Sequence, residues 1–335
     1  MRRLTHETAT LRLARPFRIS GYVFETADVL IVSLDDGTHQ GRGEGAGAYY
    51  LGDDLPNMQR QLEAARGVIE SGITRDKLRT AMPAGGARNA VDAALWELEA
   101  AQAAVPVWQL AGLKTAPQPI VTTFTIGADT PEVMAANARD YAEARSIKVK
   151  LTGDLTLDLE RVAAIRAARP EIWLGVDGNQ GFSRTELDAL VEGLSRHGVS
   201  LLEQPLARGR EADLDGFSSA IPIAGDESLL TLADVAPAKG RFDVVNIKLD
   251  KCGGLTEGLL MAAEARRLGL GVMIGTMMAS SLGTAPGFVL GQIADLVDLD
   301  GPALLAEDLQ PGVIYSSGTL YAGPEVWGSG QRSIR

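Results

Sequence analysis

From Ile120 onward, short β-branched runs alternate with amphipathic segments, and this alternation constrains the fold more than any other feature of the chain. The expected strands cover 120–126, 146–151, 172–177, 200–204, 221–225, 243–249, 271–276 and 296–299. Expected helices between them include 131–145, 156–168, 184–197 and 255–268. Eight strands with intervening helices predict an α/β protein whose parallel strands close into a (β/α) barrel.

The first part of the chain lacks this alternation. Antiparallel strands are expected at Leu11–Phe17, Ala27–Leu34 and Gln40–Gly45, the last two joined across an Asp-Asp-Gly turn, with helices near 56–71, 74–81 and 87–103. Pro106, Pro117 and Pro119 then mark a boundary. We therefore predict an α+β capping domain over 1–118, the barrel over 119–305, and a C-terminal segment, 306–335, that returns to the cap.

The net charge of the chain limits the kinds of molecule that it is expected to bind. The net charge of -11 and the pI near 4.9 disfavour nucleic acid and anionic membranes. The uncharged stretch Leu268–Ala294 has the length of a membrane span, but glycines and Pro286 interrupt it. Cys252 is the only cysteine, so an intrachain disulfide is excluded. We expect a cytoplasmic enzyme that acts on a small molecule and forms a homo-oligomer.

Three acids end successive expected strands. Asp177, Glu203 and Asp226 follow apolar runs, at steps of 26 residues (177 to 203) and 23 residues (203 to 226), each about one strand-helix unit. Successive barrel strands deliver such side chains to one rim. Singly, each acid could cap the following helix, but three at matching positions predict an oxygen-rich site for Mg²⁺.

Lysines accompany these acids. Lys148 and Lys150 are two residues apart on one strand and therefore share a face, and Lys248 ends the strand VVNIK. Lys148 would place a positive charge beside Lys150, and a bound cation would supply another. Both charges favour a lowered lysine pKa, as a general base needs. Lys251 could support the site from behind, and its role is left open.

The ordered motifs resemble the enolase superfamily, and within it the muconate-lactonizing subgroup. They are Lys148-Val149-Lys150, Asp177-Gly178-Asn179, Glu203-Gln204-Pro205, Asp226-Glu227-Ser228 and Asn246-Ile247-Lys248, preceded by Gly41-Arg42-Gly43-Glu44 in the cap. The resemblance implies the modified barrel of the enolase type. It also implies Lys150 and Lys248 as the catalytic pair, with Asp177, Glu203 and Asp226 holding one Mg²⁺ per subunit.

The last strand resembles dipeptide epimerases. In that family the pair Asp298 and Asp300 of Asp298-Leu299-Asp300 holds the ammonium group of the substrate, and Thr125, Lys148 and the backbone near Met277 match positions that line the substrate. The resemblance implies a Mg²⁺-dependent epimerase that inverts the α-carbon of a dipeptide by two-base proton transfer. Members specific for Ala-Glu carry a loop arginine where this chain has Tyr22, so an acidic substrate side chain is not expected to be strongly favoured.

Three alternatives remain at this point. An N-acyl amino acid racemase or o-succinylbenzoate synthase would use the same lysines but has no need for the two acids at 298 and 300. A muconate-type cycloisomerase is disfavoured for the same reason. A non-catalytic barrel would have no need to retain both lysines and all three acids.

Overall fold

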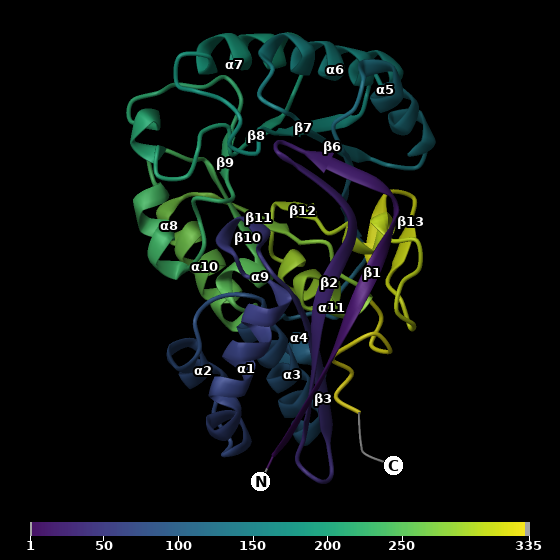
Figure 1. The fold of residues 1–335 in the computed structure, drawn as a ribbon, viewed down its shortest axis with the longest axis vertical. Helices are drawn as coiled ribbons and strands as arrows, with labels where there is room; N and C mark the ends of the chain where they lie inside the picture. The colour runs from purple at the N-terminus through teal and green to yellow at the C-terminus, as the bar shows by residue number, and fades with distance from the viewer. Residues whose placement is uncertain (1, 332–335) are drawn as a thin grey trace.

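The computed structural model describes residues 2–331, and it joins an N-terminal α+β cap to a barrel (Figure 1). The cap has a three-stranded antiparallel sheet in the order β1-β2-β3 and several helices. Its elements are β1 (Arg3–Ile19), β2 (Tyr22–Asp35), β3 (Gln40–Ala46), the 3₁₀ helix η1 (Tyr49–Leu51), α1 (Leu55–Glu70), α2 (Arg75–Ala81), α3 (Gly86–Ala103) and α4 (Val107–Leu110).

The β1–β2 hairpin is longer than the sequence predicted. Its strands run to a two-residue turn at Ser20-Gly21, where Gly21 has φ +75° and Ile19 pairs with Tyr22. A serine-glycine pair suits such a turn because glycine adopts positive φ without a steric penalty. The hairpin therefore extends from the cap along the barrel (Figure 1), and near its tip the Arg18 carbonyl oxygen accepts a hydrogen bond from the Ala128 amide at 2.8 Å, in the segment after the first barrel strand.

The glycines of β3 let the sheet of the cap press against α3. A Cβ added to Gly41 would lie 2.1 Å from the Ala94 carbonyl oxygen, and one added to Gly43 would lie 2.1 Å from that of Ala90. No side chain fits at such distances. The alternating glycines of this strand are thus required by close packing of a helix on a sheet.

The barrel follows the predicted alternation. Its strands are β5 (Thr123–Ile126), β6 (Ser146–Lys150), β7 (Trp173–Asp177), β8 (Leu201–Glu203), β9 (Ile223–Gly225), β10 (Val244–Lys248), β11 (Gly271–Gly275) and β12 (Leu296–Asp298). Its helices are α5 (Pro131–Asp140), α6 (Leu155–Ala168), α7 (Leu187–Arg196), η2 (Glu211–Leu214), α8 (Leu232–Ala238), α9 (Leu249–Cys252), α10 (Leu255–Leu268), α11 (Ser281–Gly291) and η3 (Gly301–Leu304). All paired neighbours in this eight-stranded sheet are parallel.

The predicted barrel is confirmed, and it is closed by backbone pairing everywhere except between its two edge strands. The sheet runs from β12 to β5 without a ladder between these two edges. Side chains join them instead: the Thr122 hydroxyl accepts a hydrogen bond from the Leu299 amide at 2.9 Å, and the Thr123 hydroxyl donates to Asp298. The expected strand 120–126 is split at Thr122 into β4 (Ile120–Val121) and β5.

Two expected helices are shorter in the structure. α5 ends at Asp140 instead of 145, where the Arg169 guanidinium donates to the carbonyl groups of Ala138 and Ala144 and holds a turn. α7 begins at Leu187 instead of 184, because the Glu186 carboxylate accepts the Ser183 amide at 2.9 Å and fixes a turn before the helix.

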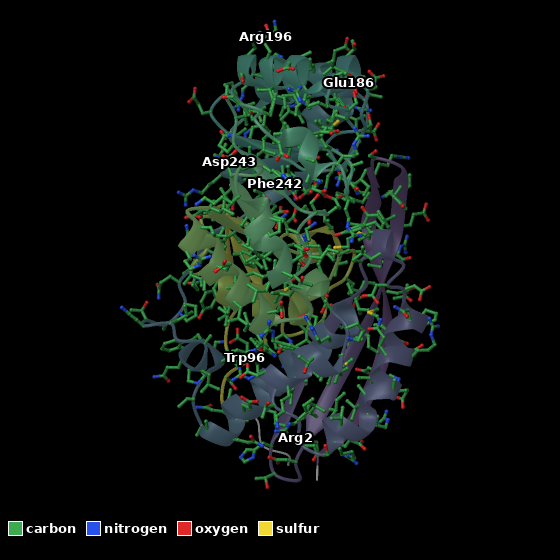
Figure 2. All side chains as sticks on the ribbon, turned by 90° about the vertical axis from the view of Figure 1, so that its left-hand side faces the viewer. Arg2, Trp96, Glu186, Arg196, Phe242 and Asp243 are labelled. Atoms are coloured by element: carbon green, nitrogen blue, oxygen red, sulfur yellow. The ribbon has the colours of Figure 1, made fainter. Side chains whose placement is uncertain are left out.

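The C-terminal segment forms β13 (Ile314–Ser316) and β14 (Thr319–Tyr321), and β14 pairs with β4. Further on, Trp327 donates to the Arg42 carbonyl oxygen at 3.0 Å, so the segment contacts the cap. The boundaries at residues 118 and 305 stay predictions. Figure 2 shows the elongated molecule from the side, with Arg2 at the cap end and Arg196 at the opposite end. Within residues 2–331, none of the helices has the length and apolar character needed to span a bilayer.

Candidate functional site

The three predicted acids converge at one end of the barrel. Asp177 ends β7, Glu203 ends β8 and Asp226 directly follows β9. Each offers one carboxylate oxygen within 4.8 Å of the others, and all three side chains are buried. Neighbouring parallel strands that end at the same level bring these acids together.

The two predicted bases lie on opposite sides of the same rim. Lys150 ends β6 and donates from Nζ to Asp177 at 2.6 Å, whereas Lys248 ends β10 and donates to Asp226 at 2.7 Å. In the sheet order, β6 and β10 are four places apart among eight strands, which places them across the barrel from each other. A small molecule bound between them would meet one ammonium group on each face.

Burial and charge perturb this cluster strongly. Burial, and then repulsion from Asp177, raises the pKa of Glu203 to about 7. Burial alone would lower the pKa of Lys248, but attraction to Asp226 and Glu203 outweighs it and raises that pKa well above its usual range. The lowered lysine pKa expected from the sequence is therefore not produced by the side chains of the chain itself, because carboxylates face this lysine directly.

Lys148 and Lys251 are both buried and paired with acids of the rim. Lys148 donates to Glu203 Oε2 at 3.3 Å and also contacts Asp298, so it links the acids of β8 and β12. Lys251, whose role the sequence left open, contacts the Asp226 carboxylate and donates to the Asp226 carbonyl oxygen at 2.6 Å. It holds Asp226 from behind the rim.

The predicted acid pair of the last strand lies across the barrel from Glu203. Asp298 is contacted by Lys148 and Thr123, while Asp300 accepts the Thr125 amide at 2.5 Å. Burial and the neighbouring Asp298 raise the pKa of Asp300 to about 6. Half-buried Met277 lies in the loop after β11. The structure thus places all five substrate-side residues around the barrel rim, without testing their roles.

Several buried oxygen atoms near the acids have no hydrogen-bond partner within the described chain, and the sequence analysis assigned none of them a role. They belong to Asn179, Glu227 and Asn246. Asn246 also donates to Glu203 Oε1 at 2.7 Å. Asn246 precedes Lys248 by two residues and therefore lies on the same face of the strand, a spacing that could have identified it as a residue of the site. Three converging carboxylates surrounded by unpaired oxygens form a donor set that fits a hard divalent cation.

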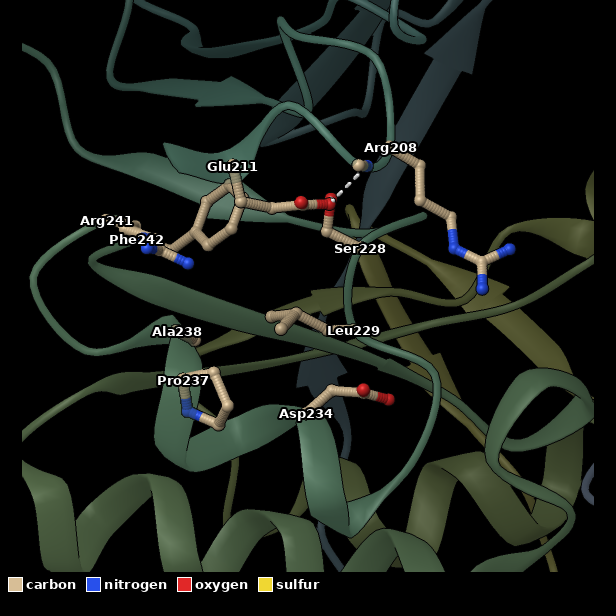
Figure 3. Close-up of a pocket in the computed structure, with 10 residues that line it drawn as sticks. Arg208, Glu211, Ser228, Leu229, Asp234, Pro237, Ala238, Arg241 and Phe242 are labelled. Carbon is tan, nitrogen blue, oxygen red and sulfur yellow. Dashed lines mark hydrogen bonds between the residues drawn. The ribbon is translucent and has the colours of Figure 1, made fainter. Parts of the chain in front are cut away.

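A hydrogen-bonded chain supports the acids from the outer side of the barrel. Gln204 Oε1 accepts the Asp226 amide at 2.9 Å, and Gln204 Nε2 donates to the Ser228 hydroxyl at 2.8 Å. Ser228 in turn donates to Glu211 at 2.6 Å. Glu211 and Ser228 meet at the wall of an outer groove of about 460 Å³, which Arg208 also lines (Figure 3). The groove thus lies on the outer side of the barrel, behind Glu203 and Asp226.

The cap carries a cluster of aromatic rings. Tyr22 and Phe24, on one face of β2, lie with their ring centroids 4.6 and 5.1 Å from that of Tyr49 in η1. Burial raises the pKa of the Tyr49 phenol, and the negative charges of Glu227 and Asp177 raise it further. The sequence pointed to Tyr22 alone, because its partners are brought together only by the fold.

Comparison with known proteins identifies the family. Residues 3–112 match the mandelate racemase / muconate lactonizing enzyme N-terminal domain, and residues 133–318 match the enolase C-terminal domain-like family. The chain belongs to the enolase superfamily. This confirms the resemblance and the fold class predicted from the ordered motifs.

Relatives of known activity cover almost the whole chain. It is 38% identical to an L-Ala-D/L-Glu epimerase of Escherichia coli, over 92% of this chain and 96% of that protein. It is 34% identical to an N-acetyl-D-glutamate racemase of a Pseudoalteromonas species, over 92% and 97% of the two chains. A dipeptide epimerase of Methylococcus capsulatus, complexed with Mg and the dipeptide L-Arg-D-Lys, superimposes with a TM-score of 0.90 at 29% identity, over 99% of each chain.

Proposed function

We propose that this protein is a dipeptide epimerase that inverts the α-carbon next to the terminal carboxylate, with one Mg²⁺ held by Asp177, Glu203 and Asp226. The observation that carries the proposal is the pair Lys150 and Lys248 on opposite strands of one rim, with Asp298 and Asp300 across from the three acids. Inversion needs a proton donor and a proton acceptor on opposite faces of one carbon, which this arrangement supplies.

The lysines move the proton. With the substrate carbon between them, one lysine accepts the α-proton at Nζ from one face, while the ammonium of the other donates a proton to the opposite face. Reversal of these roles returns the first stereoisomer, so Lys150 and Lys248 serve the two directions of one reaction. Each must lose a proton before it can act as the base.

The acids and their supports orient the substrate carboxylate. A divalent cation held there supplies Lewis-acid stabilisation of the charge that develops when the α-proton leaves, a contribution of several kcal/mol. Lys251 and Asn246 hold Asp226 and Glu203 in place by the bonds described above. Positive charge at the acids also offsets the attraction that raises the pKa of Lys248.

The opposite side of the rim favours a dipeptide over an N-acyl amino acid. Asp298 and Asp300 are both buried, and Lys148 is the cation that contacts Asp298. Two buried carboxylates facing a substrate suit an ammonium group, since a buried charge is costly unless it is paired. An acyl chain would leave them without that partner. An N-acyl amino acid racemase is the alternative, because one relative carries such a name.

A substrate panel tests the proposal. Ala-X dipeptides and N-acetyl amino acids with the same X are incubated with the Mg²⁺-loaded enzyme, and kcat/KM for epimerisation is measured for each. We expect kcat/KM to be higher for the dipeptides. Higher values for the N-acetyl compounds would replace the epimerase with the racemase, and lack of activity on both sets would leave a binding protein.

A further inference from the structure

We propose that helix α3 of the cap positions Lys248 for proton transfer, through buried side chains that hold the segment directly after this lysine. The positioning residues are Arg88, Asn89 and Asp92. The inference rests on the proposed function, because it requires Lys248 and Lys150 to act on opposite faces of the substrate carbon. It gives the cap an influence on one of these two faces only.

The first contact holds α9, which begins at the residue after Lys248. Asn89 donates from Nδ2 to Asp250 Oδ1 at 2.8 Å, and the Ala46 amide donates to the same oxygen at 2.9 Å. Asn89 and Ala46 both belong to the cap, and Figure 1 shows α9 between β10 and α3. Asp250 is only two residues from Lys248, so a movement of its backbone moves the lysine.

The second contact holds the end of α9. The buried guanidinium of Arg88 donates from Nε to the Gly253 carbonyl oxygen at 3.2 Å and also contacts the carbonyl oxygen of Cys252. The last carbonyl groups of a helix cannot be bonded within it, so a donor from outside stabilises them. On the side of the cap, Arg88 Nη1 donates to the Arg79 carbonyl oxygen at 2.8 Å. The guanidinium therefore ties α9 to the cap.

The third contact holds the start of α10. Asp92 lies one turn after Arg88 on α3, and it accepts the Thr256 amide at 3.0 Å and the Thr256 hydroxyl at 2.6 Å. A carboxylate there satisfies an amide that the helix itself leaves unbonded. A Cβ added to Gly253 would lie 2.1 Å from Arg88 Nε, and one added to Gly254 would lie 2.4 Å from Asp92 Oδ2. The two glycines thus permit the close approach of this segment to α3.

The other base is supported in a different way. The segment after Lys150 is held from within the barrel, because Asp158 of α6 accepts the amides of Thr152 at 3.0 Å and Gly153 at 2.9 Å. Loosening the contacts of α3 should therefore displace Lys248 and leave Lys150 in place. This asymmetry distinguishes positioning of one base from general support of the fold.

The test separates the two faces with single-lysine variants. Asn89→Ala is introduced into Lys150→Ala, in which Lys248 is the remaining base, and separately into Lys248→Ala, in which Lys150 remains. Deuterium incorporation at the α-carbon of an Ala-X dipeptide is measured for the stereoisomer that each parent exchanges. We expect exchange to slow roughly 10-fold in the first background and to stay unchanged in the second. A displacement of about 1 Å can cost about 10²-fold, and the Ala46 amide still holds part of the contact.

Two controls accompany the measurement. Each variant is assayed at saturating Mg²⁺, because Lys251 of α9 contacts Asp226 and its movement would weaken the metal site. Any remaining loss of the cation would slow exchange in both backgrounds. Gln102→Ala, at an exposed position near the end of α3, is the matched control and should change neither rate.

Folding is checked separately. Thermal unfolding of each variant identifies any that loses the fold. If Asn89→Ala does so, Arg88→Met takes its place, because it removes the guanidinium from the end of α9 and keeps an unbranched side chain. The same selective slowing of exchange by Lys248 is expected.

The outcomes separate this inference from the proposed function. Equal slowing in both backgrounds would overturn the inference, because α3 would then support the rim as a whole. Unchanged exchange in both backgrounds would overturn it as well. In either case the epimerase stands, provided that the intact enzyme epimerises dipeptides. If the intact enzyme reacts only with N-acyl amino acids, the epimerase fails, and the same comparison with an N-acyl substrate still decides the role of α3.

Discussion

The rim of the barrel and the aromatic cluster of the cap hold their side chains by different kinds of contact. At the rim, buried lysines and acids pair at distances such as 2.6 Å for Lys150 and Asp177, and the barrel strands hold them rigidly. In the aromatic cluster, Tyr22, Phe24 and Tyr49 contact one another through ring faces and edges, and Tyr22 is half exposed.

This difference in contacts gives the two regions a different tolerance to substitution. Moving a proton needs charged groups at defined positions, which strand ends provide. Tyr22, Phe24 and Tyr49 make ring contacts instead, and a hairpin tip can change without disturbing those positions. Substitutions at the rim are therefore expected to change rates for every substrate, whereas substitutions in the aromatic cluster are expected to leave the positions of the rim groups unchanged.

Loss of the cation should have the largest effect. Chelation with EDTA is expected to abolish epimerisation and Mg²⁺ to restore it, because a contribution of several kcal/mol corresponds to a factor of about 10³ or more in rate. Glu203→Gln should weaken Mg²⁺ binding measured by titration calorimetry, while Glu264→Gln, at a half-buried position on α10 where Glu264 pairs with Arg267, should not. Full activity of a metal-free preparation would contradict the role given to the three acids.

The acid pair across the rim should have the next largest effect. Asp300→Asn removes a buried charge facing the substrate ammonium, and loss of one partner in such a contact costs about 2–5 kcal/mol. We expect kcat/KM for dipeptides to fall roughly 30-fold or more, with N-acetyl amino acids affected much less. Asp140→Asn, at an exposed position on α5, is the control. An equal loss for both classes of substrate would show that Asp300 acts on the fold instead.

The smallest effect is expected from the supports behind the rim. Glu211→Gln weakens the acceptor that holds Ser228 and, through Gln204, the Asp226 segment. Loss of such outer contacts typically weakens metal binding by about 10- to 100-fold. We expect the Mg²⁺ dissociation constant to rise by about 10-fold, toward the lower end of that range. Asp215→Asn, an exposed neighbour in the same loop, should leave the constant unchanged.

The same contrast explains what the sequence could predict. The rim residues end strands of one regular repeat, so spacing alone placed Asp177, Glu203 and Asp226 together, and the two-residue period paired Lys148 with Lys150. The aromatic cluster could not be found in this way. Phe24 and Tyr49 are separated in sequence by the rest of β2 and by β3, and they meet because the hairpin extends to a turn at Ser20-Gly21.

Contacts between residues that lie far apart in the sequence were also not predicted. Lys148 contacts Asp298, 150 residues away, and Glu211 supports Ser228 from a loop without a recognisable motif. The edges of the barrel at β5 and β12 are joined through the hydroxyl groups of Thr122 and Thr123, which a strand pattern does not reveal. These features depend on side-chain contacts between elements, whereas periodicity reports only on the elements themselves.

Isotope exchange by single-lysine variants tests the two-base arrangement most directly. Lys150→Ala and Lys248→Ala are each incubated with both stereoisomers of an Ala-X dipeptide in deuterium oxide, and deuterium at the α-carbon is followed by mass spectrometry. Lys239→Ala, at an exposed position after α8, is the control with normal activity. We predict that each rim variant loses epimerisation and exchanges the α-proton of one stereoisomer only, with opposite stereoisomers for the two variants. Normal epimerisation by either variant, or exchange of the same stereoisomer by both, would contradict the assignment of Lys150 and Lys248 to opposite faces of the substrate.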